Sequence, residues 1–295
     1  MIEAVLKHEY AEVNGVRLHY VTTGKGKLIM FVHGFPEFWY EWKDQLAEFG
    51  RDYQAVAPDM RGYNLSAKPA EVDQYQIKYL VEDLRELAET LGHKKFIMVA
   101  HDWGGVIAWV FAMAHPEILE KLVIINAPHP AVFQRELRAN PAQQKASQYM
   151  LMFRSPQAEQ MLSANNYALL VQVVLREGLK TGAFTEEDKE AYLAAWAQPG
   201  ALTGGLNYYR AAQVGPPTPG EDAQGFTAEF GSLEVKVPTL VIWGEKDEAL
   251  LTGNLEGLDK FVPNLTIRRI PDATHWVTHE KPAQVNQYIR EFISS

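Results

Sequence analysis

The chain has 295 residues, of which 47% are apolar, 22% are charged and 11% are aromatic, and its net charge at pH 7 is −9. The absence of cysteine excludes disulfides, thiolate metal sites and a cysteine nucleophile, and it fits the cytoplasm as the compartment. The acidic balance argues against nucleic-acid binding, and the lack of a signal peptide and of any long apolar run predicts no export and no membrane segment.

The first elements expected along the chain are two short strands. Residues 9–13 and 17–23 alternate apolar and polar side chains around Asn14-Gly15, a dipeptide typical of a tight hairpin turn. Continuous apolar runs then indicate strands buried on both faces, at 28–32, 55–58, 96–100, 122–126 and 239–243, with another strand around 267–270. Segments of helical period lie at 75–91, 104–115 and 282–293. This alternation predicts an α/β fold with a mostly parallel central sheet and helices on both faces.

The strand pattern stops after residue 126. From about 130 to 213 only helical windows occur, such as 157–179 and 186–197, and a Pro/Gly-rich stretch follows at 214–225. We therefore expect a core domain built from residues 1–129 and 234–295. Residues 130–233 would form an inserted helical cap with a return loop, covering the edge of the sheet where α/β proteins bind ligands.

The run from Ala100 to Gly105, AHDWGG, follows a predicted buried strand and opens a predicted helix. It has the form of a nucleophile elbow, a tight strand-to-helix turn that lifts one side chain above the sheet. Asp102 is the lifted residue. The alternative is that Asp102 only caps the helix, since aspartate is a favoured N-cap.

The order of the later residues favours the elbow. A nucleophile elbow is followed in the chain by an acid after a later strand and then by a histidine on a loop near the end. Asp247 follows the strand at 239–243, and His275 follows the strand around 267–270. A metal-binding role for His275 is disfavoured, because no HxH or HExxH spacing accompanies it, and we expect no metal.

The segment from Phe31 to Pro36, FVHGFP, ends the first buried strand. Backbone N–H groups there, at Phe35, and after the nucleophile, at Trp103, would form an oxyanion hole. His33 is expected to bond the loop backbone, and the Asp59–Arg61 segment is expected to be scaffold.

Five segments together resemble one known family. They are HGFPEFWYEW at 33–42, DMRGY at 59–63, HDWGG at 101–105, VPTLVIWGEKD at 237–247 and THW at 274–276. Across almost the whole chain the sequence is similar to the soluble epoxide hydrolases of the α/β-hydrolase family, whose fold carries an inserted helical cap. Haloalkane and fluoroacetate dehalogenases share the aspartate nucleophile. The resemblance implies an enzyme without a cofactor.

An aspartate nucleophile indicates a particular chemistry. A carboxylate that attacks a saturated carbon gives a stable alkyl ester, whereas attack on a carbonyl gives only a mixed anhydride. Asp102 is ionised at neutral pH and needs no base for this attack, so His275, oriented by Asp247, can activate water in a second step. Water then hydrolyses the ester of Asp102.

The leaving group distinguishes the aspartate enzymes from one another. An epoxide oxygen leaves as an alkoxide and needs a proton, which a phenol can supply. The run LNYYR at 206–210 is similar to a motif in which epoxide hydrolases carry a ring-opening tyrosine, and the match falls on Tyr209. The segment at 148–153, with Pro156 after it, resembles the family's other tyrosine segment, with the match on Tyr149. Tyr208 and Tyr167 remain alternatives.

Departures from the related families support the same function. Haloalkane dehalogenases typically carry asparagine after His-Gly, where this chain has Phe35, and fluoroacetate dehalogenases typically have arginine after the nucleophile, where it has Trp103. We expect Phe35, Trp39, Trp103 and Trp276 to line an apolar substrate pocket.

We therefore expect an epoxide hydrolase that converts lipophilic epoxides to vicinal diols with water, as a monomer or homodimer. Its catalytic residues are expected to be Asp102, His275, Asp247, Tyr149 and Tyr209. The alternatives are a haloalkane or haloacid dehalogenase and a non-catalytic ligand receptor on the same fold.

Overall fold

A computed structural model describes residues 5–220 and 232–295, so parts of the predicted cap and of its return loop at 214–225 lie outside the described residues. The described strands form one eight-stranded sheet in the order β1-β2-β4-β3-β5-β6-β7-β8. The first three strands of that order pair antiparallel, and all later pairs are parallel. The strands are β1 (Lys7–Val13), β2 (Val16–Gly24), β3 (Leu28–Val32), β4 (Gln54–Pro58), β5 (Phe96–His101), β6 (Leu119–Ile125), β7 (Thr239–Gly244) and β8 (Leu265–Ile270).

Each strand predicted from the sequence is present. The hairpin of β1 and β2 turns at Asn14 (φ 44°) and Gly15 (φ 76°), and a type I′ turn requires a positive φ at both of these positions. Every residue of β3, β5 and β7 is buried, as their continuous apolar runs predict.

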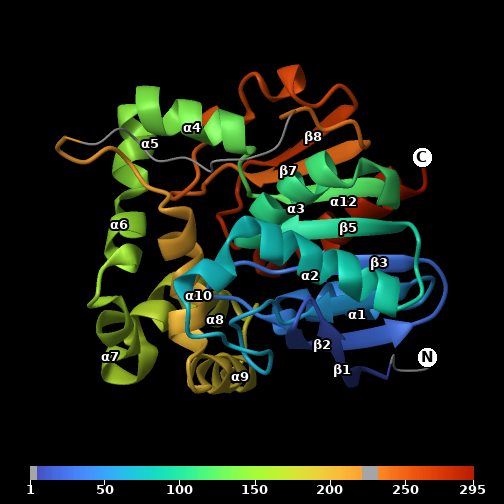
Figure 1. Ribbon diagram of the computed structural model, residues 1–295, viewed down its shortest axis with the longest axis horizontal. Coiled ribbons are helices and arrows are strands. Elements are labelled where there is room, and N and C mark those ends of the chain that lie inside the picture. The colour runs from blue at the N-terminus through green and yellow to red at the C-terminus, as the bar shows by residue number, and fades with distance from the viewer. Residues whose placement is uncertain (1–4, 221–231) are drawn as a thin grey trace.

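Helices cover both faces of the sheet, with α2 and α3 in front of it and α1 and α12 behind it in Figure 1. The described helices outside the segment between β6 and β7 are α1 (Lys43–Phe49), α2 (Ile77–Thr90), α3 (Asp102–Ala114), α11 (Val277–Glu280) and α12 (Pro282–Ile293). Short 3-10 helices are η1 (Trp39–Trp42), η2 (Val72–Tyr75), η3 (Pro116–Ile118), η5 (Thr252–Leu255) and η6 (Leu258–Lys260). Within the described ranges, no helix is long and apolar enough to cross a membrane.

Between β6 and β7 the described residues form helices and no strand of the sheet. These insert helices are α4 (Pro130–Ala139), α5 (Pro141–Ala146), α6 (Gln148–Arg154), α7 (Ala158–Leu170), the π-helix η4 (Val171–Leu175), α8 (Arg176–Thr181), α9 (Glu186–Trp196) and α10 (Ala201–Ala212). Figure 1 shows α5 to α10 gathered at one end of the sheet, opposite the end where N and C are marked.

The helical window predicted at 157–179 is interrupted in the structure. Asn165, Asn166 and Tyr167 all have positive φ, between 51° and 61°, so the chain leaves the helix there before η4 begins. Asparagine tolerates this left-handed region, which the apolar spacing alone does not reveal.

Candidate active site

Asp102 stands at a sharp turn between β5 and α3. Its φ is +49°, in the left-handed region that costs a non-glycine residue energy and is concentrated at functional sites. The turn needs glycine nearby, because a Cβ on Gly104 would lie 2.3 Å from the Val32 carbonyl oxygen, and one on Gly34 would lie 2.3 Å from Asp102 Oδ1. This geometry agrees with the predicted elbow, in which the chain approaches itself closely and lifts one side chain.

The three residues predicted in chain order meet in space. His275 Nδ1 lies 2.7 Å from Asp247 Oδ2, and His275 Nε2 lies 3.4 Å from Asp102 Oδ2. Asp247 is fully buried, while Asp102 and His275 are each 12% exposed. One histidine therefore bridges two carboxylates, one enclosed and one open to a small molecule.

Hydrogen-bond donors that were not predicted from the sequence hold the Asp247 carboxylate in place. Its Oδ1 accepts the backbone N–H groups of Ala249 and Leu250 at 2.8 and 2.9 Å. Its Oδ2 accepts from the Asn126 side chain at 2.8 Å, and that amide also bonds the backbone of Gly244 in both directions. Asn126 follows β6 and has a φ of 37°. In the sequence, a polar residue directly after a buried strand was the feature that could have pointed to Asn126.

The charges of these groups depend on one another. Burial opposes ionisation of Asp102, but the hydrogen bond and charge of His275, with help from His101 and the Phe35 amide, lower the pKa of the Asp102 carboxyl. Burial alone would lower the pKa of His275, yet the two carboxylates raise it well above 6.5. The resting site therefore holds an imidazolium next to a carboxylate.

One of the two backbone donors predicted around Asp102 contacts its carboxylate. The Phe35 N–H donates to Asp102 Oδ1 at 2.8 Å. Trp103 is the second residue of α3, at the positive end of the helix dipole. The two ring nitrogens of His33 bond backbone groups, at Gly34 and Met60, which agrees with its predicted structural role.

The Asp59–Arg61 segment after β4 makes structural contacts, as predicted. Asp59 and Arg61 each bond other residues rather than one another. Asp59 accepts from the Trp39 backbone, the Asn64 side chain and, at 2.6 Å, His19 Nδ1. Arg61 instead binds the buried carboxylate of Asp83 through two nitrogens, at 2.8 and 2.6 Å.

Both predicted tyrosines come from the insert helices and lie over the core. The Tyr209 ring on α10 packs edge-on against Trp103 at 5.0 Å and against Phe35 at 5.7 Å between centroids. Tyr149 on α6 lies 6.3 Å from Tyr209. Burial and then the charge of Asp102 raise the pKa of both phenols well above 10, so both remain protonated.

The alternative tyrosines have other partners. The Tyr208 hydroxyl donates to the carbonyl of Arg61 at 2.8 Å. The Tyr167 ring packs 6.0 Å from that of Trp196. The Tyr208 ring also packs edge-on against Trp103, at 5.6 Å, so the partner of its hydroxyl is what distinguishes it from Tyr209.

Comparison with known proteins gives the family. The model of the alpha/beta hydrolase fold family matches residues 27–282. Epoxide hydrolase 4 of Mus musculus is 37% identical over 97% of this chain and 79% of its own length. The crystal structure of an epoxide hydrolase from Bacillus megaterium in complex with an inhibitor has a TM-score of 0.91 and 39% identity, covering 97% of this chain and all of that one. The chain belongs to the epoxide hydrolase family of α/β-hydrolases.

Two further relatives are similar to this chain over almost its whole length. An AB hydrolase superfamily protein of Bacillus subtilis is 40% identical over 98% of this chain and 99% of its own length. A mutant of the Bacillus megaterium epoxide hydrolase, solved with its product (R)-3-[1]naphthyloxy-propane-1,2-diol, has a TM-score of 0.92 and 38% identity, with 97% and 100% coverage. The product of that relative is an aryl-substituted vicinal diol.

The space beside Asp102 is small and mostly apolar. A cavity of about 20 Å³, room for about one water molecule, is lined by Asp102, Trp103, Val106, Pro128, Phe133, Met150, Tyr209 and Leu250. Trp103 was predicted to line the pocket. Phe133, Met150 and Leu250 were not, because they come from α4, α6 and the loop after β7 and share no motif.

The other predicted pocket residues lie in different places. Phe35 packs against Tyr209, and Trp276 lies edge-on to His275 at 4.9 Å, in the wall of a cavity of about 570 Å³ that Asp247 also lines. Trp39 is not brought to this group. Its backbone N–H is held by Asp59 and its ring packs against His8, Phe38 and Tyr40, so we no longer assign it to the substrate pocket.

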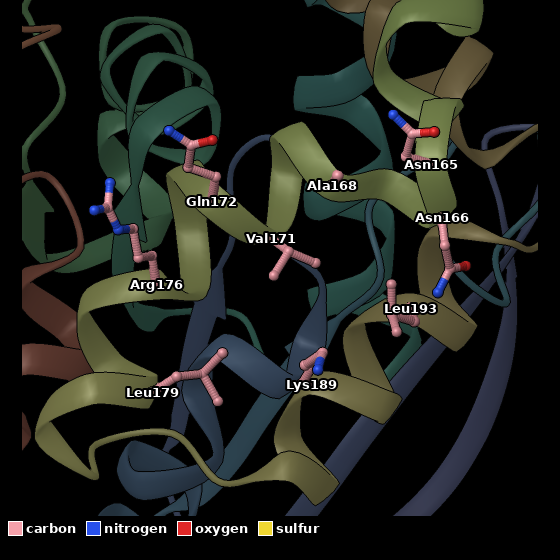
Figure 2. Close-up of a pocket in the computed structure, with 9 residues that line it drawn as sticks. All are labelled: Asn165, Asn166, Ala168, Val171, Gln172, Arg176, Leu179, Lys189 and Leu193. Carbon is pink, nitrogen blue, oxygen red and sulfur yellow. The ribbon is translucent and has the colours of Figure 1, made fainter.

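Figure 2 shows a separate cavity of about 730 Å³ among the insert helices. Val171, Leu179 and Leu193 gather around its middle, while Gln172 and Arg176 point away. Neither Asp102 nor His275 lines it. The predicted catalytic residues therefore do not face this larger hollow.

Proposed function

We propose that this protein hydrolyses lipophilic epoxides to vicinal diols through an alkyl ester on Asp102. The observation that carries the proposal is that two protonated tyrosines from the insert helices, Tyr209 buried and Tyr149 half-buried, meet beside a carboxylate that a histidine contacts from the other side. We also propose residues 130–233 as the cap domain, 1–129 and 234–295 as the core, and the cytoplasm as the compartment.

In the first step a carboxylate oxygen of Asp102 attacks an epoxide carbon. The carbon–oxygen bond of the ring breaks, and Tyr149 or Tyr209 donates its proton to the departing oxygen. The ester carries no charge, so His275 loses one of the two carboxylates that hold its proton. His275 then gives up this proton, which returns the tyrosine from phenolate to phenol. His275 is now a neutral base.

In the second step His275 takes a proton from water, whose oxygen attacks the ester carbonyl of Asp102. The Phe35 and Trp103 N–H groups stabilise the oxyanion. The ester bond breaks, the diol leaves with one proton, and Asp102 returns as a carboxylate beside protonated His275. Epoxide and water are the only reactants, and no cofactor enters the balance.

The halide alternative is less well supported. A dehalogenase needs N–H donors aimed at the leaving halide, and the Trp103 side chain instead hydrogen-bonds Tyr209. The lining of the small cavity is apolar apart from Asp102 and the Tyr209 hydroxyl, and no lysine or arginine among the described residues lines it to hold an anionic substrate.

Intact-mass measurement tests the proposal. His275→Gln treated with phenyl glycidyl ether should gain the mass of one whole epoxide, because alkylation needs no base, while His275→Gln with Asp102→Asn should gain nothing. An unmodified His275→Gln protein that binds the epoxide would contradict the ester route. The wild-type enzyme should form diol from the epoxide, and faster bromide release from 1-bromohexane would favour the dehalogenase instead.

A further inference from the structure

A second buried histidine lies behind the proposed base. His101, the last residue of β5, directly precedes Asp102, and its side chain is fully buried. Its Nε2 lies 2.9 Å from the backbone carbonyl oxygen of His275, and the two imidazole rings are 4.7 Å apart. The residue before the nucleophile thus contacts the main chain of the residue that activates water.

The other nitrogen of His101 contacts a buried acid. Glu41 Oε1, from η1, lies 2.7 Å from His101 Nδ1, and the Glu41 side chain is fully buried as well. Among the described residues, both Glu41 carboxylate oxygens and His101 Nδ1 are buried without a hydrogen bond, although Oε1 and Nδ1 lie 2.7 Å apart. The attraction between the two groups therefore offsets part of the cost of burying them.

The partner of each His101 ring nitrogen indicates how the ring is held. A carbonyl oxygen only accepts, so His101 Nε2 must carry a hydrogen and donate it to His275. On the other side of the ring, Nδ1 lies 2.7 Å from Glu41 Oε1. Both sides of the imidazole ring are thus in short contact with a polar group.

We propose that Glu41 and His101 are positioning residues, which hold the His275 main chain so that its ring can activate water toward the Asp102 ester. This inference rests on the proposed function. Attack by Asp102 needs no base, whereas ester hydrolysis needs His275 in place. The pair should therefore serve the second step and leave the first nearly unaffected.

A purely structural pair would behave differently. Arg61 and Asp83 form another buried ion pair, with side chains at most 1% exposed, and neither contacts Asp102, His275 or Asp247 in the described structure. Losing a carboxylate there should lower the melting temperature and leave the balance of the two steps unchanged. Asp83→Asn is thus the matched control.

The experiment measures both steps by rapid quench with phenyl glycidyl ether. Glu41→Leu and His101→Leu each remove one part of the arrangement, and either suffices if the other does not fold. We expect alkylation within a few-fold of wild type and hydrolysis about 10- to 100-fold slower, so that alkyl-enzyme accumulates. Glu41→Gln, whose amide can donate to His101 Nδ1, should restore hydrolysis.

A double-mutant cycle tests whether Glu41 acts through His101. Glu41→Leu added to His101→Leu should slow hydrolysis no further. If the Leu variants keep the wild-type ratio of the two rates, or slow both steps equally, the inference is overturned while the proposed function stands. A wild-type enzyme that forms no alkyl-enzyme, even under single-turnover conditions, would overturn both.

Discussion

At the scale of single residues, the two tyrosines distinguish epoxide opening from the other reactions of an aspartate nucleophile. Either single Phe substitution leaves one phenol, whereas Tyr149→Phe with Tyr209→Phe leaves an alkoxide without a proton. We expect the double variant to alkylate about 10² to 10⁴ times more slowly than wild type. Tyr208→Phe is the control, because that hydroxyl bonds the Arg61 carbonyl, and it should alkylate normally. Wild-type alkylation by the double variant in a stopped-flow assay would show that other groups supply the proton.

The pH dependence of the second step is also set by single residues. In the free enzyme, Asp247 and Asp102 raise the pKa of His275. Esterification removes the charge of Asp102, so the pKa of His275 must be lower in the alkyl-enzyme. Because the base must be neutral, hydrolysis should speed up as pH rises through this lower pKa. Rapid-quench decay of the alkyl-enzyme across pH gives the pKa of His275 in the ester, and NMR titration gives its pKa in the free enzyme. The pKa in the ester should be the lower of the two. Hydrolysis that slows with rising pH would contradict it.

At the scale of elements, the loop after β3 is built around the nucleophile. A Cβ on Gly34 would lie 2.3 Å from Asp102 Oδ1, so Gly34→Ala must displace the carboxylate or the Phe35 N–H. We expect alkylation to fall by about 10²-fold, since a displacement of about 1 Å can cost that much. Gly92→Ala is the control. Its Cβ would meet nothing within 4 Å, so its positive φ should reduce only the melting temperature. Similar kinetics for the two variants would contradict the role of the loop.

The elements also show what the sequence could and could not predict. The strands were predictable because their burial leaves a continuous apolar run, and Asp102, Asp247 and His275 because each comes after a strand in the chain order of a nucleophile elbow. The break at Asn165 was not predictable, since apolar spacing carries no information on φ. Neither was the cavity lining of Phe133, Met150 and Leu250, which come from two helices and a loop far apart in the chain. Trp39 was misplaced because closeness to a motif in sequence does not fix the direction of a side chain.

At the scale of the whole molecule, the insert helices and the core are joined by hydrogen bonds close to the site. The Trp196 indole donates to the Pro36 carbonyl at 2.7 Å, and the Tyr192 hydroxyl donates to Glu37 at 2.5 Å. With the Tyr208 bond to Arg61, these contacts tie α9 and α10 to the core loops. Tyr209, the proposed acid from the insert helices, and Asp102, the proposed nucleophile from the core, are thus held in one arrangement. More than a hundred positions separate them in the sequence.

The central claim is that the oxygen added to the epoxide comes first from Asp102 and only then from water. A single turnover in ¹⁸O-labelled water, with enzyme in excess over phenyl glycidyl ether, tests it most directly. Ester hydrolysis places water oxygen on the carboxylate, so mass spectrometry of the peptide that contains Asp102 should show the label there, and the first diol should be unlabelled. Label in the first diol with an unlabelled Asp102 would mean that water attacks the epoxide directly, and would contradict the account.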